Sequence, residues 1–281
     1  LGFQIEEETK AAIRRQACFL KDISAERIQV ELDKLLVSDH PEVLVDAYKL
    51  GVTEVILPEF DVMMETPQNN PHHKYSVGMH TVESMKQIEP EHILRWTMLL
   101  HDVGKPEARE EGKDKDHFKM HPVIGEKIAE TIIRRLKFDN QTLKQVKTLV
   151  LWHDRRFGSL KEASLKTVRR WVSQIGPDMF AKLMKIQAAD IAAQSEYQRE
   201  EKEAVLAKTK ELFQEILETG DCLTVRDLAV SGTDMIEAGV PQGREVGQML
   251  SWLLDQVLET PDLNKKETLM RLVEGKRENG Q

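Results

Sequence analysis

Residues 246–258 read VGQMLSWLLDQVL, and the spacing of their apolar side chains decides the class of fold. Apolar residues recur at intervals of i, i+3, i+4 and i+7, which places them on one face of a helix. The same periodicity governs residues 128–136 and 143–150, whereas alternation of β-branched and polar residues is nearly absent. Only GVTEVILPEF, residues 51–60, resembles a strand. We therefore expect an all-α protein. The apolar positions of the first stretch are Val246, Met249, Leu250, Leu253, Leu254, Val257 and Leu258.

Breaks in the helical pattern divide the 281 residues into three parts. Residues 1–65 are expected to form a helical segment that ends in LPEFDVMMET. The polar, proline-containing TPQNNPHHKYSVG opens a second part, 66–194, and a long charged helix from Ser195 leads into the third, 195–281. The chain starts at Leu1 rather than at a methionine, so we expect it to be a piece of a longer protein.

The composition is that of a globular protein, with 40% hydrophobic and 31% charged residues. No apolar run approaches the ~20 residues of a membrane span, and LGFQIEEETK lacks the pattern of a signal peptide. The two cysteines, Cys18 and Cys222, lie far apart, which argues for a reducing compartment and against a disulfide framework. We therefore expect a cytoplasmic protein without a cysteine-based zinc site.

The charge distribution leaves room for a nucleic-acid partner although the net charge is −8. Residues 127–185 hold 14 Lys/Arg against 5 Asp/Glu, a net charge of +9, so the remainder carries −17. These cations either form one basic face that binds RNA or lie on separate solvated helix faces. A helix that starts near Pro241 is a further candidate phosphate site, assisted by Arg244. The candidate RNA-binding residues are Arg155, Arg156, Arg169, Arg170 and Arg244.

Histidine and aspartate side chains gather near the ends of predicted helices in the second part. Taken singly, each has a simpler explanation as a hydrogen-bonded core residue. Taken together, four imidazoles and two carboxylates from five helical segments match the nitrogen and oxygen ligands that Mn, Fe, Co, Ni or Zn prefer, and Mg is a further candidate. We therefore expect one or two divalent ions to bind them. The candidate metal ligands are His80, His101, Asp102, His121, His153 and Asp190.

The stretch LLHDVGKP, residues 99–106, suggests how such a cluster would act on a substrate. His80, His101, Asp102 and Asp190 would bind one ion, and Asp102, with two oxygens, would reach a second ion held by His121 and His153. Gly104 would let the backbone turn away from the carboxylate. Lys105 would meet a substrate phosphate as a point charge. Asp102 and Lys105 are accordingly the candidate catalytic residues.

The order His…His-Asp…Asp, with HDVGKP in the form HDxGK and ADIAA (189–193) downstream, resembles the HD superfamily of metal-dependent phosphohydrolases. The resemblance covers residues 72–194. It implies hydrolysis of a phosphomonoester or of a 2′,3′-cyclic phosphodiester. The additional His121 and His153 resemble members of that superfamily with ligands for two metals.

The flanking segments resemble a second family. LGFQIEEETKAAI (1–13), ISAERIQVELDKLL (23–36) and GVTEVILPEF are similar to the neck of bacterial tRNA nucleotidyltransferases, the CCA-adding and poly(A) polymerase family. AGVPQGREVG (238–247) is similar to the tRNA-holding region of that family. The resemblance implies an elongated helical protein with a central HD bundle. The sequence lacks a glycine-rich turn leading into an Asp-x-Asp pair, so we do not expect this chain to transfer nucleotides by itself.

Two functions follow as the main alternatives. The first is a metal-dependent phosphohydrolase within a tRNA nucleotidyltransferase-like protein involved in tRNA 3′-end processing. The second is an RNA-binding body, holding tRNA, whose metal site is structural or vestigial. A helical scaffold without either role is a third alternative. The expected partners are tRNA or RNA and a small phosphoester or nucleotide, with no membrane; a homodimer could form through the helix that starts near Ser195.

Overall fold

The protein is helical, as the periodicity of its sequence predicts. A computed structural model describes residues 5–113 and 115–278. Within these residues no β-strand forms, and the β structure consists of one isolated antiparallel bridge between Glu110 and His117. The expectation of an all-α protein is therefore confirmed.

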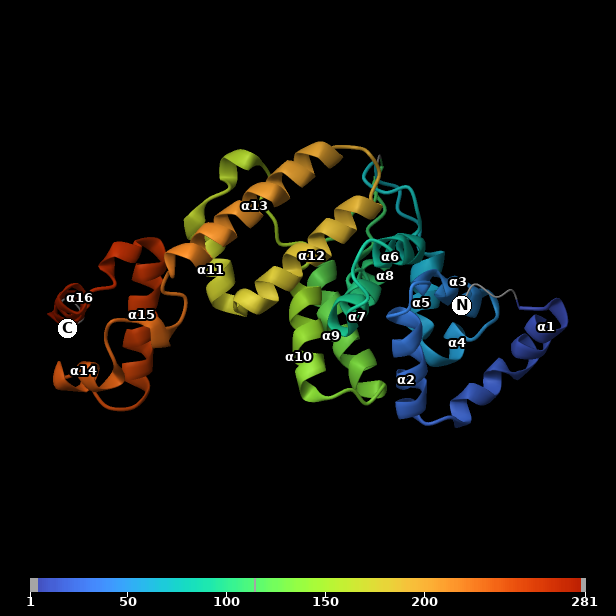
Figure 1. Cartoon of the computed structure of the whole chain (residues 1–281), viewed down its shortest axis with the longest axis horizontal. Helices are drawn as coiled ribbons and strands as arrows, with labels where there is room; N and C mark the ends of the chain where they lie inside the picture. The colour runs from blue at the N-terminus through green and yellow to red at the C-terminus, as the bar shows by residue number, and fades with distance from the viewer. Residues whose placement is uncertain (1–4, 114, 279–281) are drawn as a thin grey trace. The chain divides into compact units, whose positions relative to one another are not determined.

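The helices form two compact units, each described here by itself (Figure 1). The first unit comprises the residues up to 156 together with 181–206, and the second comprises 157–180 together with the residues from 207 onward. Helices α12 and α13 contribute residues to both units. The division of the chain into three parts stays a prediction.

The first unit contains most of the helices. Their bounds are α1 Glu7–Gln16, η1 Ala17–Asp22, α2 Ala25–Leu36, η2 Pro41–Val43, α3 Leu44–Lys49, α4 Thr53–Ile56, α5 Pro58–Glu65, α6 Val77–Met85, α7 His92–Leu100, α8 Lys105–Ala108, α9 His121–Arg135 and α10 Asn140–Trp152, with the later residues of α12 (Pro177–Ala193) and the first residues of α13 (Arg199–Thr219).

The segment 51–60, which resembles a strand in the sequence, forms α4 and α5 instead. Pro58 is the first residue of α5, where its missing N–H costs no hydrogen bond because the first turn of a helix leaves its N–H groups free. The apolar residues of this segment are buried in a helical environment, among them Leu57 and Phe60. Tertiary packing therefore decides between two local structures that the sequence leaves open.

Helix α7 lies in the core of the first unit. All of its residues from Ile93 to Leu100 are buried, as expected for a helix that is surrounded by other helices. Helices α2, α6 and α10 contact it, and α9 packs against α10, beside which it is drawn in Figure 1. Helix α7 is buried up to its last residue, Leu100. The residues that follow it, His101 and Asp102, therefore lie inside the unit rather than on its surface.

Gly104 is required for close packing, not for the turn that the sequence suggested. Its φ of −83° and ψ of −11° are accessible to any residue. A Cβ atom at this position would lie 2.2 Å from the carbonyl oxygen of His121 and 2.5 Å from the amide nitrogen of Gly125. The absence of a side chain therefore brings the start of α9 directly against the HDVGK segment.

The second unit is built around the helix that VGQMLSWLLDQVL predicts. Helix α15 buries Leu250, Leu253, Val257 and Leu258 along one face, as the spacing requires. The bounds in this unit are η3 Leu160–Glu162, α11 Leu165–Ile175, η4 Val225–Asp227, α14 Gly232–Glu237, α15 Arg244–Glu259, η5 Pro261–Leu263 and α16 Lys266–Glu278, with the remaining residues of α12 and α13.

The two cysteines differ in environment, and we expect them to differ in reactivity. Cys18 is exposed, whereas Cys222 belongs to the core of the second unit. Burial, together with the charge of Asp227, raises the pKa of the Cys222 thiol to about 11. Since the thiolate is the reactive form, roughly one Cys222 in a thousand is reactive at pH 8.

Titration with a chromogenic disulfide reagent at pH 8 is therefore expected to give one equivalent of thiol in the native protein and two in denaturant. As the pH rises toward 11, the slow native-state reaction of Cys222 should accelerate. Two fast equivalents in the native protein would contradict the burial of Cys222.

Among the described residues, every helix is too short or too polar to cross a lipid bilayer.

Candidate metal centre

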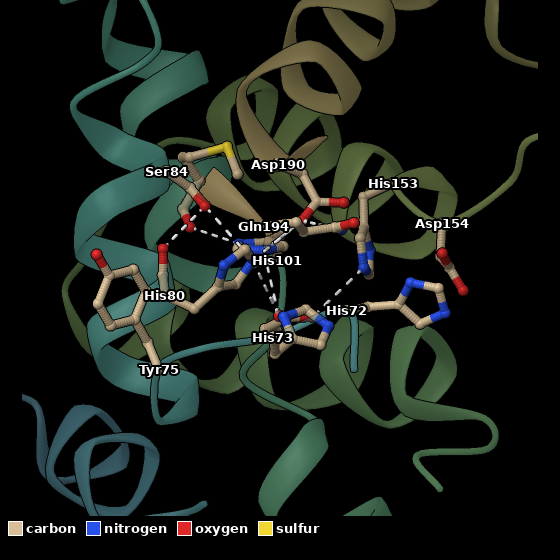
Figure 2. A network of polar contacts seen from close by, with 12 residues as sticks. His72, His73, Tyr75, His80, Ser84, His101, His153, Asp154, Asp190 and Gln194 are labelled. Carbon is tan, nitrogen blue, oxygen red and sulfur yellow. Dashed lines mark hydrogen bonds and ion pairs between the residues drawn. The ribbon is translucent and has the colours of Figure 1, made fainter. Parts of the chain in front are cut away.

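The fold brings all six candidate metal ligands together in the first unit. Four of them, His80, His101, His153 and Asp190, are labelled in Figure 2. His80 lies within α6, the pair His101-Asp102 follows α7, and His121 is the first residue of α9. The two others are His153, directly after α10, and Asp190, in the later part of α12. All six are buried. Their convergence is what the sequence predicts, and their role as metal ligands stays a prediction.

The six residues form two groups of three. His80, His101 and Asp190 make the first group, and Asp102, His121 and His153 make the second. Within each group, the atoms able to bind a metal lie within 4.8 Å of one another. Each group therefore has the size of a site for one ion.

Asp102 lies between the two groups. Its Oδ2 is 3.3 Å from Nε2 of His101 and 3.8 Å from Nε2 of His80. Its Oδ1 is 3.5 Å from Nε2 of His121 and 3.6 Å from Nε2 of His153. One carboxylate oxygen thus faces each group, which is the arrangement that a bridging ligand needs.

Three of the imidazoles are oriented by the same local hydrogen bond. Nδ1 of His101 lies 2.7 Å from the carbonyl oxygen of Met98, and Nδ1 of His153 lies 2.7 Å from that of Val150. His121 bonds in the same way to Phe118, at 2.8 Å. A carbonyl oxygen only accepts hydrogen bonds, so Nδ1 carries a proton, and in the neutral ring Nε2 presents a lone pair. This is the usual second contact of a histidine that binds a metal.

His121 and His153 provide the strongest indication of a bound cation. Their Nε2 atoms face each other at 3.2 Å, and in the neutral rings both present a lone pair. Burial and the neighbouring His153 lower the pKa of His121 to about 4, so the ring of His121 is neutral near neutral pH. A divalent ion would satisfy both nitrogens, and the donor set of imidazoles and carboxylate suits one.

The first group contains two buried nitrogens without a hydrogen-bond partner among the described residues. His80 Nε2 is 3.0 Å from Oδ1 of Asp190, whereas its Nδ1 is buried and has no hydrogen-bond partner among the described residues. Nε2 of His101 is likewise buried without a hydrogen bond. A polar atom buried in this way costs free energy unless a ligand satisfies it. The nitrogen that faces the group, Nε2 of His101, is the one that a metal ion would satisfy.

Both carboxylates of the cluster are ionised. Burial by itself would raise the pKa of Asp190, but His80 and Arg156 lower it well below its usual range. For Asp102, the opposing effects of His101 and Lys105 likewise lower the pKa well below the usual range. The cluster therefore keeps two negative charges in the interior at neutral pH.

Two cations balance these charges: Lys105, which is buried, and Arg156, which is partly buried. Lys105 Nζ lies 2.7 Å from Oδ2 of Asp102 and also donates to the side chain of Gln68, at 2.9 Å. Arg156 Nη2 donates to Oδ2 of Asp190, at 3.0 Å, and to Asp154. Lys105, a candidate for binding substrate phosphate, is thus beside the ligands and within reach of a group that binds there.

Sequence reasoning missed several polar neighbours of the cluster. Gln68 lies in the loop between α5 and α6 and accepts a hydrogen bond from Lys105. The two residues are far apart in the chain, so no sequence motif predicts their contact. Gln194 donates to Oδ1 of Asp190 at 3.0 Å. It follows Asp190 by four residues, so the helical period could have placed both on one face.

The five candidate RNA-binding arginines are divided between the two units. Arg156 belongs to the buried cluster, and Arg155 lies exposed over the ring of Trp152, 4.4 Å from its centroid. In the second unit, Arg169 is paired with Asp221 and Arg170 with Glu259, while Arg244 is exposed at the start of α15. Their role in RNA binding stays a prediction.

Many cations of residues 127–185 are neutralised by carboxylates from elsewhere in the chain. The sequence excess of +9 in this region therefore overstates its available positive charge. Each of these pairs lies within one unit. The pairs are Arg135–Glu59, Lys182–Glu91, Lys185–Glu89, Arg169–Asp221 and both Lys166 and Arg170 with Glu259.

Two family models match the chain. The model described as "tRNA nucleotidyltransferase domain 2 putative" matches residues 118–273, and the model described as "Probable RNA and SrmB- binding site of polymerase A" matches residues 2–64. The first match covers more than half of the chain and includes His121, His153 and Asp190.

Similar curated proteins are tRNA nucleotidyltransferases. A CC-adding tRNA nucleotidyltransferase of Thermus thermophilus is 30% identical over 271 residues, 92% of this chain and 60% of that protein. An A-adding tRNA nucleotidyltransferase of Deinococcus radiodurans is 32% identical over 166 residues, 54% of this chain and 38% of that protein. A multifunctional CCA protein of Pseudomonas fluorescens is 32% identical over 118 residues, 40% of this chain and 29% of that protein. This chain thus spans no more than 60% of the length of these relatives.

Proposed function

This chain belongs to the tRNA nucleotidyltransferase domain 2 family, and from that premise we propose that it is the RNA-binding helical body of a protein that acts in tRNA 3′-end processing. The observation that carries the proposal is the family match over residues 118–273, joined by the match of residues 2–64 to an RNA-binding site. The relatives are named CC-adding tRNA nucleotidyltransferase, A-adding tRNA nucleotidyltransferase and multifunctional CCA protein. These names support tRNA as the RNA partner.

Exposed cations supply the charge that an RNA phosphate backbone requires. Several lysines and arginines are exposed and have no ion pair with another described residue, so their charge is available to a ligand. Five of them lie in α9, in α10, in the turns that follow these two helices, or at the start of α15. They are Lys127, Lys137, Lys144, Arg155 and Arg244.

We expect the affinity for tRNA to fall by at least about tenfold between about 50 and 200 mM salt, because contacts with phosphates release bound counterions. Arg155→Ala and Arg244→Ala should each weaken binding a few-fold and reduce the slope of log Kd against log salt by about 1. Fluorescence anisotropy with labelled tRNA measures both effects.

Lys208→Met is the matched control, since Lys208 is already paired with Glu211 on the same helix. An affinity that does not change with ionic strength would refute RNA binding through these cations.

We propose metal-dependent hydrolysis of phosphoesters as a second function of the same chain. The observation that favours it is the pair of Nε2 atoms of His121 and His153 that face each other at 3.2 Å. His80, His101, Asp190 and Oδ2 of Asp102 would hold one ion, and His121, His153 and Oδ1 of Asp102 would hold another. A divalent ion bound there would supply Lewis-acid chemistry and would lower the pKa of a water ligand, in favourable sites to about 7.

The side chains around the cluster would bind and orient the substrate. Lys105, beside Asp102, would bind a phosphoryl oxygen as a point charge. Arg156 holds Asp190 in place through a hydrogen bond to Oδ2 and leaves Oδ1 directed at His80. The backbone carbonyls behind His101, His121 and His153 fix the direction of each ring.

Metal analysis of the purified chain, combined with a panel of phosphomonoesters and cyclic phosphodiesters, tests this second function. A chain that binds no divalent ion and hydrolyses none of these esters would leave the RNA-binding body as the function of the molecule.

A further inference from the structure

Two loops meet at the edge of the histidine and aspartate cluster. The loop between α5 and α6 contains His72 and His73, and the short connection between α12 and α13 contains Ser195. The amide of Ser195 donates to the carbonyl oxygen of His72, at 2.9 Å, and its hydroxyl donates to that of Pro71, at 2.5 Å. The first turns of α13 are thereby held against the loop that borders the cluster.

Lys202 projects from the start of α13 into this junction. Its Nζ donates to Nδ1 of His72, at 3.0 Å, and to the side-chain oxygen of Gln194. Neither acceptor is a carboxylate, and no carboxylate of the described residues lies within ion-pair distance of Lys202. Gln194 in turn donates to Oδ1 of Asp190, at 3.0 Å. Lys202 is therefore a half-buried ammonium group without a carboxylate partner. The side chain of Gln194 connects it to Asp190, a candidate metal ligand.

Other cations crowd the same place. Burial, followed by the charge of Lys202, lowers the pKa of His72, and Lys115 and Arg156 act in the same direction. Burial and the charge of Arg156 also lower the pKa of Lys202. Like charges held together in this way are unfavourable unless an anion binds among them. Asp190 and Asp154 offset part of this repulsion, but Arg156 is already hydrogen-bonded to both carboxylates.

Metal binding would create a surplus of positive charge among these groups. Without an ion, the charges of Asp102, Asp154 and Asp190 balance those of Lys105, Arg156 and Lys202. Each divalent ion adds two positive charges to this set. A phosphoryl group is the anion whose entry would restore the balance.

We propose that Lys202 is a specificity-determining residue that binds a phosphoryl oxygen at the edge of the cluster and favours dianionic phosphomonoesters over monoanionic cyclic phosphodiesters. The proposal rests on the second function proposed above. A cation attracts a dianion about twice as strongly as a monoanion at the same distance, so its loss affects the monoester more.

The experiment uses the full chain loaded with Mn²⁺ and measures the dissociation constant of inorganic phosphate by calorimetry. Because a charge-assisted hydrogen bond is lost, Lys202→Met should weaken phosphate binding on the order of tenfold or more. Lys202→Arg keeps the charge and should retain most of the affinity. Lys208→Met, on the same helix but paired with Glu211, should change it by less than about twofold.

Two further measurements separate anion binding from a structural role. The manganese content of Lys202→Met should equal that of the unchanged protein, and its kcat/KM should fall more for a phosphomonoester than for a cyclic phosphodiester. Unchanged phosphate affinity, an equal fall for both substrates, or a parallel loss of manganese would overturn the role of Lys202. Failure of the unchanged protein to bind manganese or phosphate would overturn the phosphoester site itself, and Lys202 with it.

Discussion

Asp102→Asn is expected to lower both the metal content and the phosphoester hydrolysis of the chain by about 100-fold or more. Loss of a residue that hydrogen-bonds to a metal ligand typically costs about 10- to 100-fold, and loss of the ligand itself should cost at least as much. Asp102 directs one oxygen at His101 and the other at His121 and His153, so its replacement affects both groups of ligands. The amide of asparagine offers one neutral oxygen and an NH2 group that repels a cation. Elemental analysis after dialysis and initial rates with a phosphoester measure the two losses.

Asp154→Asn is the matched control for Asp102→Asn. Asp154 also carries a negative charge near the cluster, where it pairs with Arg156, but it belongs to neither group of ligands. The Asp154→Asn protein should keep its bound metal and most of its phosphoester hydrolysis. Since Lys105 and Asp102 form a buried pair, breaking it costs about 3–5 kcal/mol, and thermal unfolding must show that Asp102→Asn is still folded. A folded Asp102→Asn protein with unchanged metal content would refute the metal centre.

Gly104→Ala is expected to destabilise the first unit by about 2–3 kcal/mol or more, through overpacking of a well-packed core. The added Cβ would overlap the carbonyl oxygen of His121 and the amide nitrogen of Gly125, which are backbone atoms that no rotamer change can move. Helix α9 would have to shift, and His121 would shift with it, so metal bound by the second group should be lost as well. Thermal unfolding and metal content report the two consequences.

Gly247→Ala provides the comparison for Gly104→Ala. Gly247 lies in α15, and nothing stands within 4 Å of a Cβ atom built on it. Alanine is favoured over glycine in a helix by about 0.5–1 kcal/mol, so this variant should be neutral or slightly more stable. Equal melting temperatures for Gly104→Ala and the unchanged protein would show that α9 and the HDVGK segment are not in tight contact.

The sequence predicts the helices of this protein better than it predicts the partners of individual side chains. The apolar period of residues 246–258 determines which face of α15 is buried, because a helix must bury its apolar face. The convergence of His80, His121 and Asp190 is also predictable, since buried carboxylates and imidazoles are costly unless they pair with one another or bind a common ion.

Long-range electrostatic pairs could not be predicted in the same way. The pairing of Arg135 with Glu59 and of Arg169 with Asp221 joins residues far apart in the chain, and no local pattern marks either pair. For this reason a region with a sequence charge of +9 loses much of its available charge on folding. Arg156 was a candidate for RNA binding from charge alone, yet it is hydrogen-bonded to Asp190.

The hydrogen bonds from His101, His121 and His153 to carbonyl groups three residues earlier have a consequence for how the centre is filled. Each hydrogen bond joins residues that lie within one turn of the backbone. The direction of each ring is therefore fixed by nearby residues of the chain and does not depend on an ion. A chelator that strips the centre would therefore leave the three rings aimed as before. Loading of the proposed centre with a divalent ion would then require little reorganisation of these three rings.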